Sequence, residues 1–395
     1  MKYTAVSCEA TGKKVALSDM ILTKSMPTAA GSKMLAGYVS LFDATVAEKL
    51  AENGYSVCGK AGVGEFAIDL YGETAAEGAY TGENGRLLFP AAEILKDGSA
   101  MAVVSLDVNG AERRAAAVEG LTFVKPTYGT VSRFGVIAAA CSGETVGVMA
   151  KTADTCKEVL SSTRSYDEKD GTSLPLSMRK ETAPVKRVAL LSAFLNKADD
   201  AVKARVKATA AALTAVGVTV EETDGASLLA AGEAWNILMC AELCNNVSRY
   251  DGVKYGYRAK NYKTIEELYT NSRTEAFGLL LKAAILYGSD VLSTENYEAL
   301  YDKSLRIRRA TLNYCNELFT KYDALLLPAT TSLGYDEAEV KANPYLCFEE
   351  NLYTAPASIT GLPCVVTGGA QLIGSSFAED ALLDLATLLE KEGTK

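Results

Sequence analysis

Amphipathic helix patterns and short apolar strand patterns alternate along this chain, and this alternation restricts the fold more than any other feature. Val46 and Leu50 are four residues apart, which predicts a helix from 44 to 53 with Asp43 as its cap. The apolar segment 55 to 59 follows directly and predicts a buried strand. A helix that leads into a buried strand is one unit of an α/β fold.

The same pattern recurs in the second half of the chain. Val202, Val206 and Ala210 have helical spacing and predict a helix over 198–216, which is followed by a strand over 218–222. Further strands are predicted over 187–192 and 323–328, and a long helix over 295–321. Buried strands that alternate with helices pack as a parallel or mixed sheet covered by helices. We therefore predict an α/β/α fold with a mixed central sheet.

The length and composition allow one large domain or two ordinary ones. The chain has 395 residues, of which 48% are hydrophobic, so it can bury a substantial core. The polar stretch from Thr163 to Glu181 is predicted to be a loop, and the elements on both sides of it are expected to join one sheet. We therefore predict a single domain over residues 1–395, and a boundary in this loop is the alternative.

Charge and cysteine usage restrict the setting of the protein. The 40 basic and 49 acidic residues give a net charge of −9, which disfavours direct binding of nucleic acid. The nine cysteines are scattered, as expected of reduced thiols in the cytoplasm. The first residues lack the apolar core of a signal peptide, and Lys282 interrupts the longest apolar stretch, from 276 to 287. We expect a cytoplasmic protein without membrane contacts.

The chain contains no histidine, and this absence excludes several kinds of chemistry. Ser-His-Asp and Cys-His catalysis and most catalytic zinc sites need an imidazole. Cys240 and Cys244 are interpreted as two small core residues of a helix rather than as a zinc pair. The sequence also lacks the glycine-rich loops that bind nucleotide phosphates. We predict no metal and no cofactor, which leaves histidine-free acyl transfer.

The segment from Phe123 to Val136 resembles the strand and loop that follow the nucleophile in the amidase-signature family. The segments 249–258, 361–363 and 371–374 resemble one branch of that family, the A subunits of glutamyl-tRNA(Gln)/aspartyl-tRNA(Asn) amidotransferase. The resemblance extends over residues 12 to 390 and lacks the family's helices before its first strand. It implies the amidase-signature α/β/α fold and a connection with translation.

The family cleaves amides with a lysine, a serine in a cis peptide and a serine nucleophile. In the segment 106–113, Asp107, Gly110 and Arg113 match the family and fix the register, so Ala111 stands at the nucleophile's own position. Asn109 replaces one of the family's loop glycines. Ser18 stands where the resemblance implies the lysine, with Lys24 and Lys60 displaced in register. Leu87 is opposite the cis-serine, within a residue or two because the chain has an apparent deletion upstream of it.

The positions that the resemblance assigns to substrate binding are also changed. Val108 replaces a threonine beside the nucleophile, Ala284 replaces an arginine that holds the glutamine carboxylate, and Asn351 replaces an aspartate that holds the amino group. Tyr255 is the residue of this surface predicted to be retained, although the alternative that it only fills the core is open. We expect a more apolar cleft, or one filled by Arg86 and Phe89.

These replacements favour a catalytically inactive relative with a binding or assembly role, working with amidotransferase B-like and C-like subunits. Removal of the nucleophile alone costs about 10⁶-fold in rate in a serine hydrolase. The alternative is an active amidase or amidotransferase subunit that releases ammonia from glutamine for tRNA-bound glutamate. Such an enzyme would use a displaced serine, for which Ser99, Ser105 and Ser142 are the candidates.

Overall fold

A computed structural model describes residues 3–7, 9–179 and 182–393. All of its named strands join one eleven-stranded sheet in the order β1-β3-β2-β4-β6-β5-β10-β11-β9-β7-β8. In chain order the strands are β1 Tyr3–Val6, β2 Lys13–Ser18, β3 Tyr55–Ala61, β4 Ala102–Asp107, β5 Thr122–Lys125, β6 Thr145–Ala150, β7 Arg187–Leu191, β8 Thr219–Thr223, β9 Ala324–Leu327, β10 Cys364–Thr367 and β11 Ala370–Gly374.

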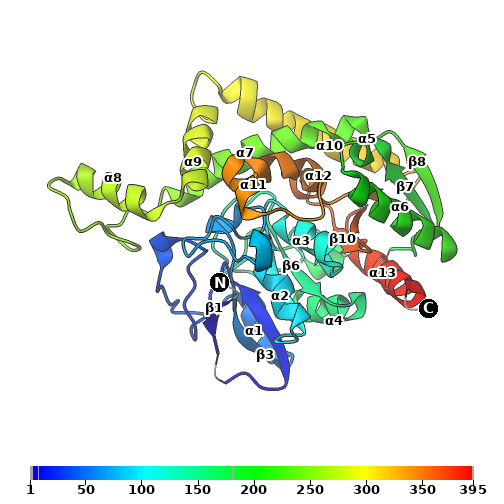
Figure 1. Cartoon of the computed structure of the whole chain (residues 1–395), viewed down its shortest axis with the longest axis horizontal. Helices are drawn as coiled ribbons and strands as arrows, with labels where there is room; N and C mark the ends of the chain where they lie inside the picture. Colours follow the sequence, from blue (N-terminus) through cyan, green and yellow to red (C-terminus); the bar gives the residue numbers. More distant parts are fainter. Residues whose placement is uncertain (1–2, 8, 180–181, 394–395) are drawn as a thin grey trace.

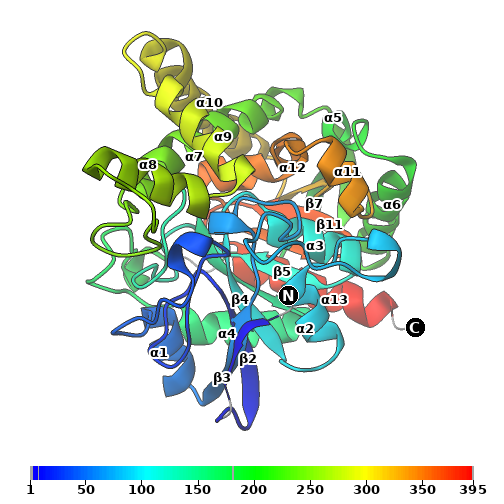
Figure 2. The same ribbon diagram turned by 60° about the vertical axis from the view of Figure 1, so that its left-hand side comes forward.

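Helices cover this sheet and build a further layer beyond it, as Figures 1 and 2 show. They are α1 Thr45–Glu52, α2 Pro90–Lys96, α3 Ala111–Glu119, α4 Ala153–Thr163, α5 Ser192–Leu195, α6 Asp200–Ala215, α7 Ala230–Val247, α8 Ile265–Ala276, α9 Leu279–Val291, α10 Lys303–Leu318, α11 Glu337–Ala342, α12 Leu346–Thr360 and α13 Glu379–Gly393. In both views α8 lies at an outer edge of the molecule.

The sheet is mixed, which confirms the predicted fold class. β2 runs parallel to β3 and to β4, and β7 runs parallel to β8 and β9, whereas the remaining pairs are antiparallel. The carboxyl ends of β2, β3 and β4 therefore meet at one edge of the sheet. Ser18 ends β2 there, and Asp107 ends β4 directly before α3.

The helix and strand predictions of the sequence hold with small changes. The helices expected over 44–53 and 198–216 are α1 and α6, and the strands expected after them are β3 and β8. The long helix expected over 295–321 begins as a π-helix, Tyr297–Asp302, and continues as α10. The prediction that Asp43 caps α1 is wrong, because Asp43 Oδ1 accepts a hydrogen bond from the backbone N–H of Lys24 instead.

The long apolar helix α7 organises the layer beyond the sheet. It packs against α9, α10 and α12, and its Trp235 is completely buried against Gly143. The crossing of α7 and α9 depends on Gly288, because a Cβ there would lie 2.6 Å from the carbonyl carbon of Cys240 and 2.8 Å from Cys244 Cβ. Cys240 and Cys244 thus both face α9, and both are free thiols, as their interpretation as packing residues requires.

We propose that residues 1–395 form a single domain. The two halves of the chain contribute neighbouring strands to the same sheet, and one contiguous hydrophobic core runs through both. Residues 165–179 of the predicted loop connect α4 toward β7 without a regular helix or strand beyond one 3-10 turn, Leu176–Met178, and Lys180 and Glu181 lie outside the described residues.

Within the described part of the chain, no helix combines the length and the apolar character that crossing a lipid bilayer requires.

The close approach of α7 and α9 gives a first prediction. Gly288→Ala should lower the free energy of unfolding by about 1–3 kcal/mol, because the added methyl group forces the two helices apart. Thermal or chemical denaturation measures this change. Gly393→Ala, at the end of α13 where a Cβ meets nothing within 4 Å, is the matched control and should be neutral or slightly stabilising. Equal stability of the two variants would contradict the role of Gly288.

Candidate functional site

The turn from β4 into α3 has the backbone shape of a nucleophile turn but presents a methyl group. Gly110 adopts a left-handed conformation with φ 88°, and a Cβ there would lie 2.5 Å from Thr354 Cγ2. Only glycine fits both restraints. Ala111 then begins α3 and is 3% exposed. Its side chain can neither attack a carbonyl carbon nor release a proton.

The residues that match the family around Ala111 hold the scaffold together. Arg113 and Asp107 form a completely buried ion pair, with Nε and Oδ2 2.7 Å apart. The same guanidinium donates to the Thr354 carbonyl and to Ser358 Oγ, each at 2.6 Å. Because these two acceptors belong to α12, Arg113 fixes α3 and the end of β4 to that helix.

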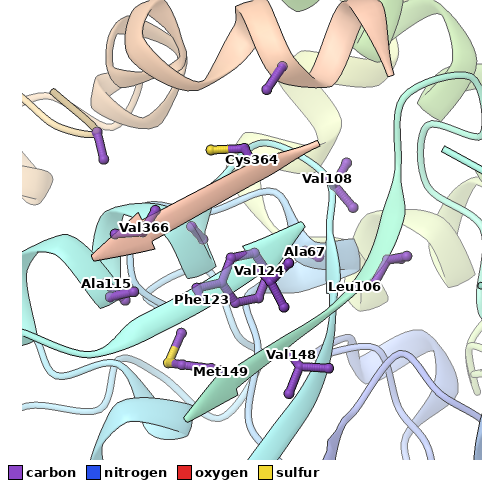
Figure 3. Close-up of a cluster of buried hydrophobic side chains, with 14 of the residues drawn as sticks. Ala67, Leu106, Val108, Ala115, Phe123, Val124, Val148, Met149, Cys364 and Val366 are labelled. Carbon is purple, nitrogen blue, oxygen red and sulfur yellow. The ribbon is translucent and has the colours of Figure 1, made fainter. Parts of the chain in front are cut away.

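Val108 belongs to the core rather than to a polar site. Figure 3 shows it in a cluster of buried hydrophobic side chains that includes Leu106 and Cys364, and its side chain is completely buried. A threonine hydroxyl at this position would point into apolar surroundings unless a partner were supplied. The structure therefore provides no polar group at Val108 for a reaction at Ala111.

Ser18 lies at the edge of the sheet that carries Asp107, and its hydroxyl accepts from the backbone N–H of Met20, at 3.4 Å. The nearby lysine is Lys60, which follows from the register in which Leu17 pairs with Lys60 on β3. Burial lowers the pKa of the Lys60 ammonium to about 7, and the negative charge of Asp19 partly opposes this shift. Lys60 Nζ donates to the carbonyl of Ile21, so the structure does place a weakly basic lysine near Ser18.

Leu87 is buried beside the loop before α11. Its backbone N–H donates to the Tyr335 carbonyl at 2.9 Å, and its side chain is 3% exposed. Phe89 is also buried, as expected. The expectation that Arg86 fills the former cleft is wrong, because Arg86 is half exposed and pairs with Glu119 at 3.2 Å on the surface. Pairing with Glu119 at the surface is more favourable for the Arg86 guanidinium than burial in an apolar cleft, where the charge would lose its water.

The expectation of a more apolar cleft stays a prediction; buried titratable groups lie around Arg114, three residues after Ala111. The Arg114 guanidinium donates to the backbone carbonyls of Asn109 and Asp69 at 2.9 and 2.8 Å. Burial and the neighbouring Glu73 carboxyl raise the pKa of Asp69 to about 7. Burial, followed by Asp107 and Asp69, raises the pKa of Glu112 well above its ordinary value. The region therefore combines carboxyl groups of raised pKa with the buried apolar side chains of Val108 and Ala111.

The predicted substrate positions are only partly brought together. Asn351 is completely buried, and its amide nitrogen fits best toward the carbonyl oxygens of Asn109 and Cys347, both at 2.9 Å. Its side chain also contacts Asn236 at 2.7 Å. Asn236 also lines a cavity together with Ala284, so Asn236 contacts Asn351 and shares a cavity with Ala284. The side-chain amide of Asn351 is therefore engaged in hydrogen bonds within the fold.

Tyr255 does not join this group. It is 43% exposed on the loop between α7 and α8, and its ring contacts that of Tyr250 edge to face, with centroids 5.8 Å apart. Tyr250 is the tyrosine of this loop that fills the core, at 7% exposure. The alternative that Tyr255 fills the core is therefore wrong, and a role in substrate binding stays a prediction.

The candidate replacement serines have other surroundings. Ser99 comes before β4 begins, at the end opposite Ala111, which places it roughly 20 Å away along the strand, and its hydroxyl donates to Asp97. Ser105 is 1% exposed within β4. Ser142 is held by its backbone between Glu242 of α7 and Arg308 of α10. None of the three is part of the turn that presents Ala111.

No group of three or more histidine, cysteine, aspartate or glutamate side chains has metal-binding geometry within residues 3–7, 9–179 and 182–393. Two arginines of α10 have partners within the fold: Arg306 pairs with Asp302 at 2.6 Å, and Arg308 donates to the Ser142 carbonyl.

Comparison with known proteins decides the family. Residues 10–81 and 91–383 match the amidase family model. The chain belongs to the amidase family. The gap in the match, residues 82–90, contains Leu87, which is the predicted position that the match leaves out.

Curated relatives within this family carry one name. The chain is 34% identical over 402 residues to the A subunit of glutamyl-tRNA(Gln) amidotransferase from Symbiobacterium thermophilum, covering 96% of this chain and 82% of the relative. It is 35% identical to the protein of the same name from Dechloromonas aromatica, with 95% and 82% covered. The resemblance to this branch is thereby confirmed.

Solved structures agree with the fold. The A subunit of glutamyl-tRNA(Gln) amidotransferase from Thermotoga maritima superposes with a TM-score of 0.80 at 25% identity, over 98% of this chain and 87% of that one. A 6-aminohexanoate cyclic dimer hydrolase gives a TM-score of 0.82 at 17% identity, over 99% and 89%. The second likeness concerns the fold alone.

Two features of the site were missed by sequence reasoning. Glu112, next to Ala111, is buried, and its carboxyl lies near those of Asp107 and Asp69. The one signal in the sequence is its position directly before the retained Arg113. The second feature is the low pKa of Lys60, which depends on the burial of this side chain. In the sequence, Lys60 is visible only as a charged residue within the otherwise apolar strand β3.

The buried carboxyl of Asp69 gives a prediction on pH. Its pKa is raised from an ordinary value of 3.8 to about 7, so its stabilising contribution is complete below about pH 4. The contribution is lost as the pH rises through 7, when the buried carboxyl has to ionise. Asp69→Asn should therefore remove on the order of 2–4 kcal/mol from the fall in unfolding free energy between pH 4 and 8.

Denaturation curves at a series of pH values measure this slope. Asp200→Asn is the matched control, since the Asp200 side chain is completely exposed and its substitution should leave the slope unchanged. A slope that Asp69→Asn leaves as steep as in the parent protein would contradict the assignment.

Proposed function

We propose that this protein is a catalytically inactive relative of the A subunit of glutamyl-tRNA(Gln) amidotransferase that retains a binding or assembly role. The observation that carries the proposal is Ala111 at the start of α3, in a turn whose retained glycine and arginine define its register. A methyl group at this point leaves the amide carbon of a substrate without an attacking atom.

The surroundings of Ala111 support the same conclusion. Ser18 lacks the basicity of a lysine, and Lys60 directs its ammonium to the backbone of Ile21. Ala284 offers no positive charge to a carboxylate, and Asn351 offers no negative charge to an ammonium group. Free glutamine is a zwitterion, so its binding would leave both charges without the partners that compensate for lost water.

A role in assembly fits the features that remain. The segment from Arg249 to Arg258 and the Arg113 anchor keep the branch's pattern although the reactive groups are gone. We infer that the protein occupies the place of a catalytic A subunit beside B-like and C-like subunits in the cytoplasm. Its net charge of −9 makes direct contact with tRNA unfavourable, so such contact belongs to another member of the complex.

The names of the relatives support a second candidate, an active amidotransferase subunit that releases ammonia from glutamine. Identities of 34% and 35% over nearly the whole chain favour it. It requires a nucleophile other than residue 111, and of the three candidate serines Ser105 and Ser142 remain, because Ser99 lies beyond the other end of β4.

An ammonia-release assay separates the two candidates. The purified protein, both alone and mixed with the B and C subunits of the amidotransferase, should release no ammonia from glutamine above the background without protein. The expected deficit relative to an active A subunit is about 10⁶-fold, because the nucleophile is missing. Turnover that disappears in Ser105→Ala or Ser142→Ala would establish the active enzyme and refute the proposal.

The assembly role has its own test. Affinity-tagged protein purified from its source cell should bring down B-like or C-like subunits, identified by mass spectrometry, in stoichiometric amounts. Recovery of the tagged chain as a lone monomer, under conditions in which an authentic A subunit retains its partners, would contradict the role.

A further inference from the structure

A cavity of about 280 Å³ opens where α7, α9 and α12 meet, away from Ala111. Its wall includes Glu233, Asn236, Ala284, Tyr287, Tyr345 and Phe348. The volume is slightly below the usual range for small-molecule sites, which begins at about 300 Å³, so only a small ligand fits. Tyr287 and Tyr345 are 41% and 49% exposed, so the cavity has an open mouth bordered by two phenol rings.

The cavity exists because small residues follow one another on α9. Ala283 and Ala284 stand where the resemblance to the family implies two adjacent arginines, and both line the cavity. One turn later, Gly288 brings α9 into direct contact with α7 at Cys240. Contact at Gly288 and truncated side chains one turn before it leave an open space that arginine side chains would otherwise occupy.

The charge of this space is opposite to that of a carboxylate site. Glu233 is the only charged residue among the described residues that line it. Partial burial, followed by the neighbouring Cys240, Glu233 and Asp290, raises the pKa of the Tyr287 phenol. The basic residue nearest in sequence, Lys282, is directed elsewhere and donates to the Thr274 carbonyl at 2.7 Å.

Three aromatic rings and one carboxylate around a small open cavity are the combination that binds organic cations. The face of an aromatic ring attracts a cation, and the attraction grows when water is excluded. The Asn236 amide is held by the Phe348 carbonyl at 2.9 Å and by contact with Asn351, so its position in the cavity wall is fixed.

We propose that this cavity binds a small organic ammonium ion, held by the rings of Tyr287, Tyr345 and Phe348 and by the Glu233 carboxylate. The inference rests on the loss of the glutamine site proposed above, since arginines at 283 and 284 would repel the ligand. It adds to that proposal a ligand class of opposite charge at the altered position. An anionic ligand would face Glu233 without a cation to offset the repulsion.

Calorimetric titration of the whole protein with tetramethylammonium chloride tests the inference, at an ionic strength held constant with sodium chloride. We expect saturable binding, with tert-butyl alcohol, an uncharged molecule of similar shape, binding at least about threefold more weakly because it lacks the cation–π attraction. Glu233→Gln removes the attracting negative charge, and Tyr345→Leu removes one aromatic ring. Each should weaken tetramethylammonium binding about three- to tenfold.

Two matched variants guard against general effects. Tyr345→Phe keeps the ring and should retain most of the affinity, and Glu295→Gln removes an exposed carboxylate outside the cavity and should change nothing. Absence of binding, equal affinity for tert-butyl alcohol, or affinities unchanged in both Glu233→Gln and Tyr345→Leu would overturn the inference. Ammonia release from glutamine by the same preparation would instead refute the proposed loss of activity, so the two failures are distinguishable.

Discussion

The buried ion pair between Arg113 and Asp107 is the interaction on which the arrangement of the site depends. It joins the end of a central strand to the first turn of α3, and the same guanidinium reaches two acceptors on α12. Two charges taken out of water are tolerated only when nearly every donor and acceptor is satisfied. Removal of either partner would leave an uncompensated charge in the core, so selection for folding alone is enough to keep both residues.

This distinction explains how the signature of a family and its chemistry can separate. Gly110, Arg113 and Asp107 serve the fold, and they remain. Ala111 contributes no side-chain hydrogen bond to the fold, and under the proposed loss of activity its position no longer has to supply a nucleophile. Burial raises the pKa values of Asp69, Glu73 and Glu112, and the positive charge of Arg114 opposes this rise at each of them.

Sequence patterns predicted the regular elements well because helices such as α6 and strands such as β9 carry their own periodicity. The register of the site also followed from the sequence, since Asp107, Gly110 and Arg113 fix it. What the sequence could not provide were properties that depend on contacts between distant segments. Arg86 finds Glu119, 33 residues away, instead of entering the cleft, and Lys60 is acidified by burial between strands. The cavity beside Ala284 arises only where three helices, far apart in the chain, meet.

The order of strands has a consequence for the synthesis of the chain. Strands β1 to β6 form one side of the sheet and β7 to β9 the other, and the hairpin β10–β11 pairs with β5 on one side and with β9 on the other. Until residue 374 has left the ribosome, β5 and β9 each have one edge whose backbone N–H and C=O groups are unpaired. Such strand edges associate with other chains. The hairpin β10–β11 therefore closes the sheet, and until this hairpin emerges the nascent chain depends on a chaperone to avoid aggregation.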